Sequence, residues 1–284
     1  MSKTLQEIIM VLKQFWSDYG CTVMHSYDEQ VGAGTLSPFT AIYTLKNDYK
    51  NQNWNTCYEQ YSRRPTDGRF GENPNRLSGY YQFQVILKPS PSDVLNLYLK
   101  SLEKIGIDIK KNDIRFIEDD WQNPSIGAAG LGWEVWLNGM EVTQFTYMKQ
   151  IGGIEFKTIP AEITYGVERL AMYVQGVDNL FDLQFSKDKT YKDIFFDFEV
   201  DYSKYYKQNA NTQNIFRYFN ECEEEAKKLC DMNITIPAYE QCLKASNYLN
   251  ILDAMGAISQ QERTSYILRV RNLVKSVLEK SIQK

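Results

Sequence analysis

The sequence predicts an α+β fold in which an antiparallel sheet with flanking helices is followed by an all-helical C-terminal domain. Segments with strand character lie close together over residues 80–166, with few helices between them. A capped helix precedes them, and beyond about residue 200 only helical spacing remains. We therefore expect a first domain over residues 1–204 and a helical domain over residues 205–284.

The first predicted helix begins at a T-x-x-E capping box formed by Thr4 and Glu7. Apolar side chains then recur with the 3.6-residue period until Gly20, a typical helix stop. Residues 21–30 have extended character. The apolar stretch after Pro38 fits a strand as well as a helix, so its structure stays open at this stage.

A polar loop enters the first long strand. Residues 62–77, SRRPTDGRFGENPNRL, are rich in Pro, Gly, Asp and Asn, and we call them the arginine loop. The strand YYQFQVILKP follows, and IRFIEDDW, WEVWLNG and MEVTQFTYMKQI alternate as half-buried strands do. Helices are predicted in SDVLNLYLKSLEKIGI, ending at Gly106, and in AEITYGVERLAMYVQG, ending at Gly176.

The last 80 residues have only helical patterns. Residues 212–231, 237–254 and 260–282 each show apolar residues at helical spacing. The last of these segments opens with an S-x-x-E capping box of Ser259 and Glu262.

Composition excludes several classes of function. Thirty-two basic against 36 acidic residues give a net charge of −4, so no global basic field is available to hold nucleic acid. Five cysteines without C-x-x-C spacing and a single histidine, His25, cannot form a Cys/His zinc site, and no Ser-His-Asp arrangement is evident. No apolar run is long enough to span a membrane and the start lacks a signal region, so we expect a cytoplasmic protein.

The chemistry is therefore expected to run on arginines, carboxylates and a metal. Guanidinium groups bind phosphate and carboxylate oxygens bidentately, and the arginine loop supplies Arg63, Arg64, Arg69 and Arg76, although a solvated loop would also carry such charges. Acidic side chains lie on or beside the strand-like segments at Glu134, Glu141, Glu155 and Glu162, where oxygen ligands would favour magnesium. Arg169 lies in the first turns of a helix, off its apolar stripe.

Three long segments resemble a known family. They are SRRPTDGRFGENPNRLSGYYQFQVILKPSP, GLGWEVWLNGMEVTQFTYMKQIGG and EITYGVERLAMYVQGVDNLFDL. Together they resemble the alpha-subunit family of bacterial two-subunit glycyl-tRNA synthetases, which belongs to the class II aminoacyl-tRNA synthetases, and the similarity extends over essentially the whole chain. The resemblance implies a class II synthetase-like antiparallel active-site sheet and a catalytic domain over residues 1–204.

The resemblance also implies an activity and partners. ATP and glycine would form glycyl-adenylate, with Mg²⁺ and without zinc, before glycine passes to the 3′ end of tRNA(Gly). The chain would form a homodimer around Pro38 within a two-alpha, two-beta tetramer. The beta subunit would do most of the tRNA recognition, which leaves the acceptor end to this chain.

The resemblance also implies roles for individual residues that match the family's motifs. Arg63 resembles the arginine that bridges the amino-acid carboxylate and the alpha-phosphate, Phe83 the aromatic that stacks on adenine, and Arg169 the third-motif arginine. The motif departs from the common Phe-Arg-x-Glu form, so Arg63 and Arg64 both remain candidates for the principal phosphate arginine, and Glu72 is a candidate for the adenine edge.

Further ligands follow from the same resemblance. Glu141 is expected to contact ATP and the magnesium ion. The glycine site is expected to use Thr35, Gln82, Trp121, Glu134, Gln144 and Glu162, and Trp133 and Trp136 are further candidate walls that would exclude alanine. Two alternatives remain: a non-catalytic synthetase-like regulator that binds tRNA or an amino acid, which would be expected to lose Arg63 or Arg169, and a synthetase-like amide ligase without a beta subunit.

Overall fold

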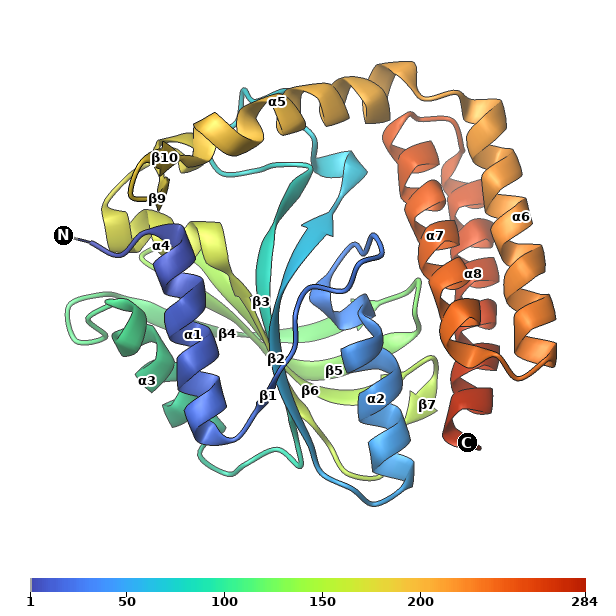
Figure 1. The fold of residues 1–284 in the computed structure, drawn as a ribbon, viewed down its shortest axis with the longest axis horizontal. Coiled ribbons are helices and arrows are strands. Elements are labelled where there is room, and N and C mark those ends of the chain that lie inside the picture. Colours follow the sequence, from blue (N-terminus) through green and yellow to red (C-terminus); the bar gives the residue numbers. More distant parts are fainter. Residues whose placement is uncertain (1) are drawn as a thin grey trace.

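An eight-stranded sheet forms the centre of the computed structural model, which describes residues 2–284 (Figure 1). All neighbouring strands are antiparallel except β1 and β2, which are parallel. In spatial order the strands are β1 (Thr22–Val23), β2 (Trp54–Arg63), β3 (Gly79–Lys88), β8 (Ala161–Gly166), β6 (Met140–Ile151), β5 (Ala128–Leu137) and β4 (Ile114–Asn123), with β7 (Ile154–Glu155) beside β6. A separate hairpin pairs β9 (Gln184–Ser186) with β10 (Lys189–Thr190).

Helices cover both faces of the sheet (Figure 1). The helices are α1 (Leu5–Tyr19), α2 (Pro38–Tyr49), α3 (Val94–Ile105), α4 (Val167–Gln175), α5 (Tyr191–Lys204), α6 (Thr212–Asp231), α7 (Thr235–Ala254) and α8 (Gln260–Ile282). Buried side chains of α1, α3 and α4 form one core with the sheet, and those of α2 and α6–α8 form a second. The α+β architecture predicted from the sequence is confirmed.

The first core depends on the alternation of side chains along the strands. Phe83, Val85 and Leu87 of β3 are fully buried in the same apolar cluster as the buried side chains of α1. Because successive side chains of a strand point to opposite faces, the intervening Gln82 and Gln84 face the other side. At β3, one face of the sheet is thus apolar and the other is largely polar.

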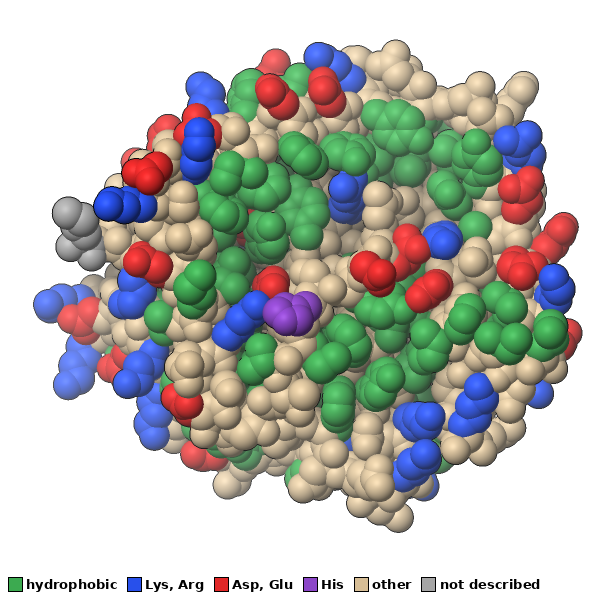
Figure 2. Space-filling model, in the orientation of Figure 1, with side chains coloured by type: hydrophobic (Ala, Val, Ile, Leu, Met, Phe, Trp, Pro, Cys, Tyr) green, Lys and Arg blue, Asp and Glu red, His purple; other side chains and the backbone are tan. Residues whose placement is uncertain are grey.

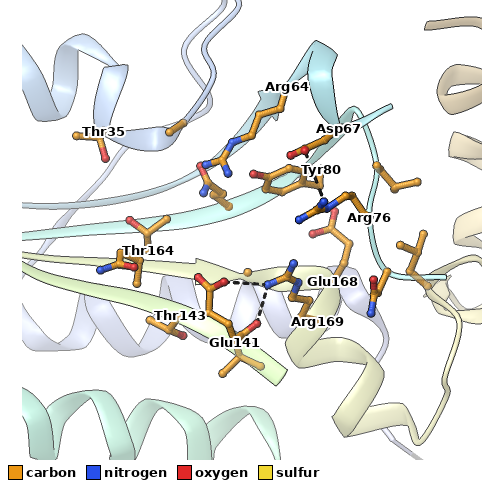
Figure 3. A pocket seen from close by; sticks show the side chains of 18 of the residues that line it. Thr35, Arg64, Asp67, Arg76, Tyr80, Glu141, Thr143, Thr164, Glu168 and Arg169 are labelled. Atoms are coloured by element: carbon orange, nitrogen blue, oxygen red, sulfur yellow. Dashed lines mark hydrogen bonds and ion pairs between the residues drawn. The ribbon is translucent and has the colours of Figure 1, made fainter. Parts of the chain in front are cut away.

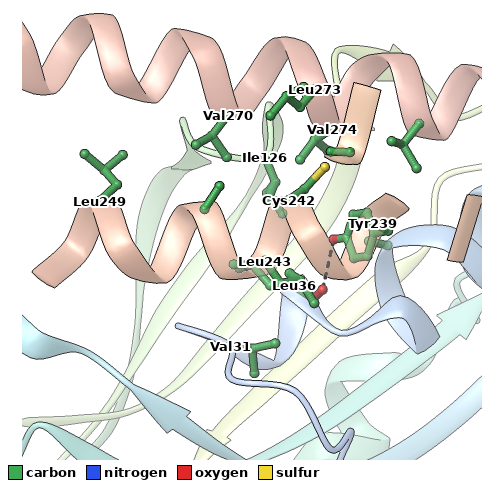
Figure 4. Packing of buried hydrophobic residues seen from close by; sticks show 14 of the residues in the cluster. Val31, Leu36, Ile126, Tyr239, Cys242, Leu243, Leu249, Val270, Leu273 and Val274 are labelled. Carbon is green, nitrogen blue, oxygen red and sulfur yellow. Dashed lines mark hydrogen bonds between the residues drawn. The ribbon is translucent and has the colours of Figure 1, made fainter. Parts of the chain in front are cut away.

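The second core joins the helical region to the rest of the chain. Figure 4 shows α7 and α8 packed together, with Val31 and Leu36 of the N-terminal region against α7. The Tyr239 hydroxyl of α7 donates a hydrogen bond of 2.9 Å to the carbonyl of Leu36. One apolar cluster therefore spans both regions, and the division into two domains at residue 204 stays a prediction.

Several helices begin and end at the residues that the sequence predicts. The Thr4–Glu7 and Ser259–Glu262 capping boxes are both present. Gly20 ends α1 with a φ of 107°, in the left-handed region that favours glycine. The segment after Pro38, whose sequence fits a strand as well as a helix, forms a helix, because Pro38 occupies its first turn and the Ser37 side chain caps it. Within residues 2–284, no helix is long and apolar enough to cross a membrane.

A buried ion pair ties α2 to the sheet. Lys88 Nζ lies 3.2 Å from Asp48 Oδ1, and both side chains are almost completely buried. The Asp48 carboxylate also accepts hydrogen bonds from the backbone N–H groups of Lys157 and Thr158, at 2.6 and 3.1 Å. A single carboxylate therefore joins α2, β3 and the segment before β8.

Asp48→Ala should destabilise the fold strongly. The substitution leaves the Lys88 ammonium buried without a counter-charge, with only the Gln52 carbonyl as acceptor, and it removes the acceptor of two backbone N–H groups. Loss of one partner costs about 3–5 kcal/mol in comparable buried pairs. Chemical denaturation gives the change in the free energy of unfolding. The control is Lys275→Ala, which breaks the half-exposed Lys275–Glu279 pair and should change stability by less than about 1 kcal/mol. Equal effects of the two substitutions would contradict this assignment.

Candidate active site

A cavity of 280 Å³ lies over the polar face of the sheet. Its walls come from the 3₁₀ turn Gly34–Leu36, the arginine loop, strands β3, β6 and β8, and the first turn of α4. Figure 3 shows side chains from these elements pointing toward one another. Segments that are far apart in the sequence therefore meet at one site.

Three arginines line one end of the cavity, which we call the cationic end after them, although the carboxyl groups of Asp67, Glu141 and Glu168 lie beside them. Arg64 and Arg76 come from the arginine loop and Arg169 from α4. Arg169 Nη1 donates to the carbonyl oxygen of Glu141 at 2.9 Å and to its Oε2 at 3.3 Å, which fixes the guanidinium against β6 (Figure 3). Arg64 Nε donates to the carbonyl of Gly32 at 3.0 Å. Guanidinium groups held in this way suit the oxygens of a polyphosphate.

Tyr80 provides an aromatic surface among these charges. The Arg64 guanidinium carbon lies 5.4 Å from the centre of the Tyr80 ring, within the range of a cation–π contact. Burial raises the pKa of the Tyr80 phenol to about 12, with the Arg64 and Arg169 charges opposing the rise. The ring therefore stays neutral at physiological pH and can stack on a planar group.

The opposite end of the cavity is polar but carries few charges. Gln82 Oε1 accepts hydrogen bonds from the backbone N–H of Gly34 and from the Ser62 hydroxyl, both at 2.9 Å. Gln144 Nε2 donates to Asp119 Oδ2 at 3.1 Å. Because these amides are held by neighbouring groups, the lining of this end is ordered before any ligand arrives.

Glu162 lies directly beneath this polar end. The side chain is 1% exposed, and its Oε1 accepts hydrogen bonds from Thr35 Oγ1 at 2.7 Å and from Gln84 Nε2. Its Oε2 is buried and has no hydrogen-bond partner among residues 2–284. Burial raises the pKa of Glu162 to about 7, and the two hydrogen bonds only partly oppose the rise.

A second buried carboxyl, Glu168, lines the cavity beside Arg169. It accepts hydrogen bonds from the backbone N–H of Tyr81 at 2.7 Å and from the Tyr191 hydroxyl at 3.0 Å. Burial raises the pKa of Glu168 to about 7 as well, although these hydrogen bonds and Arg169 lower it.

Eight of the residues predicted from the sequence line the cavity. They are Thr35, Arg64, Arg76, Gln82, Trp121, Glu141, Gln144 and Arg169. Their roles toward particular ligand atoms remain predictions.

Of the two candidate phosphate arginines, Arg64 lines the cavity and Arg63 does not. Its guanidinium carbon lies 4.2 Å from the centre of the Tyr202 ring, and its Nη1 donates to the Tyr206 hydroxyl at 3.5 Å. The Arg63 side chain thus points toward the end of α5 and away from the cavity. Since adjacent residues of an extended chain point in opposite directions, Arg64 is the arginine that enters the cavity.

Phe83 is a correction. It is completely buried in the core on the apolar face, where it packs edge-on against Tyr165. It cannot stack on a ligand in the cavity. The aromatic residue that lines the cavity is Tyr80, which shares the polar face of β3 with Gln82.

Other predicted residues do not line the cavity. Glu72 is exposed in the arginine loop. Glu134 pairs across strands with Gln144 and accepts from Trp136 Nε1 at 3.0 Å, and Glu162 lies beneath Thr35. Trp133 packs against Phe145 in the apolar core, so it is not a wall of the cavity.

Sequence reasoning missed Tyr80, Asp67 and Glu168 as cavity residues. The alternation in YYQFQVIL contained a usable signal: Gln82 and Gln84 mark the polar face, and Tyr80 has the same parity. Asp67, 4.0 Å from Arg76 Nε, and Glu168 carry no comparable signal, because their positions depend on how the loop and α4 meet the sheet.

The acidic residues fit one particular kind of metal binding. Among residues 2–284, no group of three or more His, Cys, Asp or Glu side chains is arranged to hold a metal ion. Glu141 is a partly exposed carboxylate at the cavity wall. A single carboxylate fits a magnesium ion that is held mainly by substrate phosphates and water, and does not fit an ion enclosed by protein ligands alone.

Glu162→Gln should change how stability depends on pH. Between about pH 4.5 and 7 the folded protein retains a proton on Glu162 that the unfolded chain has released, so the free energy of unfolding falls as the pH rises. The variant lacks this term and should gain roughly 3 kcal/mol relative to the wild type from about pH 4 to about pH 8. Urea denaturation at several pH values measures this difference. Glu155→Gln, at an exposed strand position, is the matched control; parallel profiles for Glu162→Gln and wild type would contradict the prediction.

Solved structures that are similar to part of this chain include two of pyrrolysyl-tRNA synthetase from Desulfitobacterium hafniense. One has 11% sequence identity and a TM-score of 0.46, and the match covers 66% of this chain and 74% of that chain. The other has 11% identity and a TM-score of 0.43, with 66% and 75% covered.

A family model gives a much more extensive match. The model described as glycyl-tRNA synthetase alpha subunit matches residues 5–284. Because this match covers nearly all of the sequence, the chain belongs to the glycyl-tRNA synthetase alpha-subunit family.

Proposed function

We propose that this chain activates glycine with ATP and, together with a beta subunit, transfers it to tRNA(Gly). The observation that carries the proposal is that one cavity joins an end lined by three arginines, the carboxyl groups beside them and Tyr80 to an end lined by uncharged polar side chains. An aminoacyl-adenylate has the same division, because a nucleotide and its phosphate are joined to an amino acid. Family membership supports the choice of glycine.

The nucleotide would occupy the cationic end. Arg64, Arg76 and Arg169 would bind phosphate oxygens, and Tyr80 would lie against the adenine ring. Glu141 would hold a magnesium ion together with the phosphates, and the ion would neutralise charge on the departing pyrophosphate. The position of Glu141 beside Arg169 supports this assignment, since the two residues could act on adjacent phosphate groups.

Glycine would occupy the polar end. Thr35, Gln82 and Gln144 would orient its ammonium and carboxylate groups, and Trp121 would leave no room for a larger side chain. Glu162 would act from beneath Thr35: a bound ammonium group nearby favours the ionised carboxyl and lowers its pKa.

The reaction needs no nucleophile from the protein. A carboxylate oxygen of glycine would form a bond to the alpha-phosphorus, and the bond from that phosphorus to the bridging oxygen of the beta-phosphate would break. The electron pair would leave with pyrophosphate. The arginines would stabilise the charge that develops on the phosphate oxygens, which is a large contribution in sites of this kind.

Partners are part of the same proposal. On the face drawn in Figure 2, basic and acidic side chains are interspersed, in keeping with the net charge of −4. We therefore assign the large tRNA-binding surface to the beta subunit, and this chain would contact the acceptor end. We place the chain in the cytoplasm as a homodimer within a two-alpha, two-beta tetramer, with residues 205–284 as the domain for packing and docking.

Glycine-dependent exchange of pyrophosphate into ATP tests the proposed activity. The purified chain should exchange label with glycine and not with alanine. Arg169→Ala and Arg64→Ala should each lower the rate by about 10²–10³-fold, because each removes a preorganised donor to the phosphates. Arg63→Ala should have a smaller effect than Arg64→Ala, since its side chain lies outside the cavity.

Arg115→Ala is the matched control for these arginines. Arg115 is exposed on β4 and paired with Asp113, so its loss should leave exchange unchanged. A folded Arg169→Ala variant with the wild-type rate would remove Arg169 from the site. Absence of any glycine-dependent exchange in the wild type would reject adenylate formation.

Transfer to tRNA should need the beta subunit. The chain alone should form adenylate but charge tRNA poorly at low and moderate salt, because its net charge of −4 gives little overall attraction for RNA. Aminoacylation of tRNA(Gly), measured with and without the beta subunit, gives the comparison. Full charging by this chain alone would exclude the proposed division of labour.

A further inference from the structure

A buried carboxylate on α5 holds the arginine loop from behind. Glu199 is 3% exposed. Its Oε1 accepts hydrogen bonds from the backbone N–H of Arg69 at 2.6 Å and from the Ser203 hydroxyl at 3.0 Å. Its Oε2 accepts from the backbone N–H and the hydroxyl of Ser78, both at 2.7 Å. One side chain therefore joins the middle of the loop to the start of β3.

The same face of α5 and the turn that follows it make further contacts with the loop. Ser203 Oγ accepts from the backbone N–H of Phe70 at 3.0 Å, and Lys207 Nζ donates to the carbonyl of Thr66 at 3.3 Å. Glu199, Ser203 and Lys207 follow one another at intervals of four residues, which places them on one side of the helical segment.

Glycines in the loop allow this close approach. A Cβ atom on Gly68 would lie 2.7 Å from Ser203 Oγ. A Cβ atom on Gly71 would lie 2.7 Å from the Phe196 ring, and Gly71 also has a φ of 78°. The loop backbone is thus fitted closely to α5.

The held loop carries much of the cationic end of the cavity. Arg64, Asp67 and Arg76 all line the cavity, whereas Glu199 does not. Apart from the 3₁₀ turn Pro65–Asp67, the part of the loop beyond β2 has no regular structure of its own, and residues 74–76 are exposed. Its arginines can be ordered for a phosphate only if something else fixes the loop backbone.

We propose that Glu199 is a positioning residue, which holds the arginine loop so that Arg64 and Arg76 are in place before the nucleotide binds. The proposal rests on the proposed function for the identity of the ligand. Four hydrogen bonds converge on one carboxylate, two of them from backbone N–H groups, and bonds to an ionised acceptor are stronger than those between neutral groups. Ordering the loop in advance lowers the entropy lost when ATP binds.

Glu199→Gln tests this role with little change in volume. Glutamine has a single acceptor oxygen, and its NH₂ group would face donors that now meet a carboxylate oxygen. We expect faster amide hydrogen exchange in residues 64–78 without any ligand, with unchanged exchange in α3. We also expect the KM for ATP to rise about tenfold or more, and the KM for glycine to change much less.

Asp197→Asn is the matched control. It removes a carboxylate from an exposed position on the same helix and should leave the loop exchange and both KM values as in the wild type. Ser203→Ala gives a second, milder test, because it removes the acceptor for Phe70 and leaves Glu199 in place. It should change loop exchange and the KM for ATP in the same direction by a smaller factor.

The two measurements separate this proposal from the proposed function. Loop exchange does not require activity, so it reports on the positioning role even if the wild type shows no glycine-dependent pyrophosphate exchange. Unchanged loop exchange in folded Glu199→Gln would overturn the proposal, as would equal rises in the KM for ATP and for glycine. If Glu199→Gln fails to fold, the same criteria apply to Ser203→Ala.

Discussion

The alternation of side chains along the central strands determines what each face of the sheet can do. On β3, Phe83 and Val85 enter an apolar core, while Gln82 and Gln84 face the opposite side. Because this period is fixed by strand geometry, a core and a polar cavity share the same few strands. The cavity therefore has a rigid floor, whose positions are held from below by the packing of α1, α3 and α4.

On the polar face of the sheet, the buried polar side chains serve as hydrogen-bond partners for one another. Thr35 and Gln84 donate to Glu162, and Thr164 donates to Gln84. Gln82 accepts from Gly34 and Ser62. A polar group buried without partners is costly, so such a network favours one arrangement of side chains. Within residues 2–284, one oxygen of this network has no hydrogen-bond partner, namely Glu162 Oε2. It lies at the polar end of the cavity, where the ammonium group of glycine is expected.

Much of the fold follows from local signals in the sequence. The Thr4–Glu7 capping box begins α1 and Gly20 ends it, so the bounds of this helix can be predicted from neighbouring residues alone. The apolar spacing of residues 212–231 likewise predicts α6 with its observed bounds. Secondary structure of this kind depends on neighbours in the chain. The segment after Pro38 was ambiguous because its apolar residues suit either structure.

The site was predictable only in part, because its residues depend on orientation as well as identity. Arg64 and Arg169 reach the cavity, but the choice between Arg63 and Arg64 depends on a single step along an extended chain, and that step reverses the side chain. The prediction that Phe83 stacks on adenine was wrong for the same reason, because its side chain points to the apolar face of β3. Glu199 carried no signal at all, since its partners lie in a distant segment and no pattern in α5 marks them.

The contacts between α5 and the arginine loop join residues that are 121 to 133 positions apart in the chain. During synthesis the loop leaves the ribosome well before α5, because the N-terminal part of a chain is made first. A nascent chain that ends before residue 199 already contains Arg64, Arg76 and Arg169. It lacks the acceptors on α5 that bind the loop backbone, so the contacts between α5 and the arginine loop can form only after α5 has been synthesised.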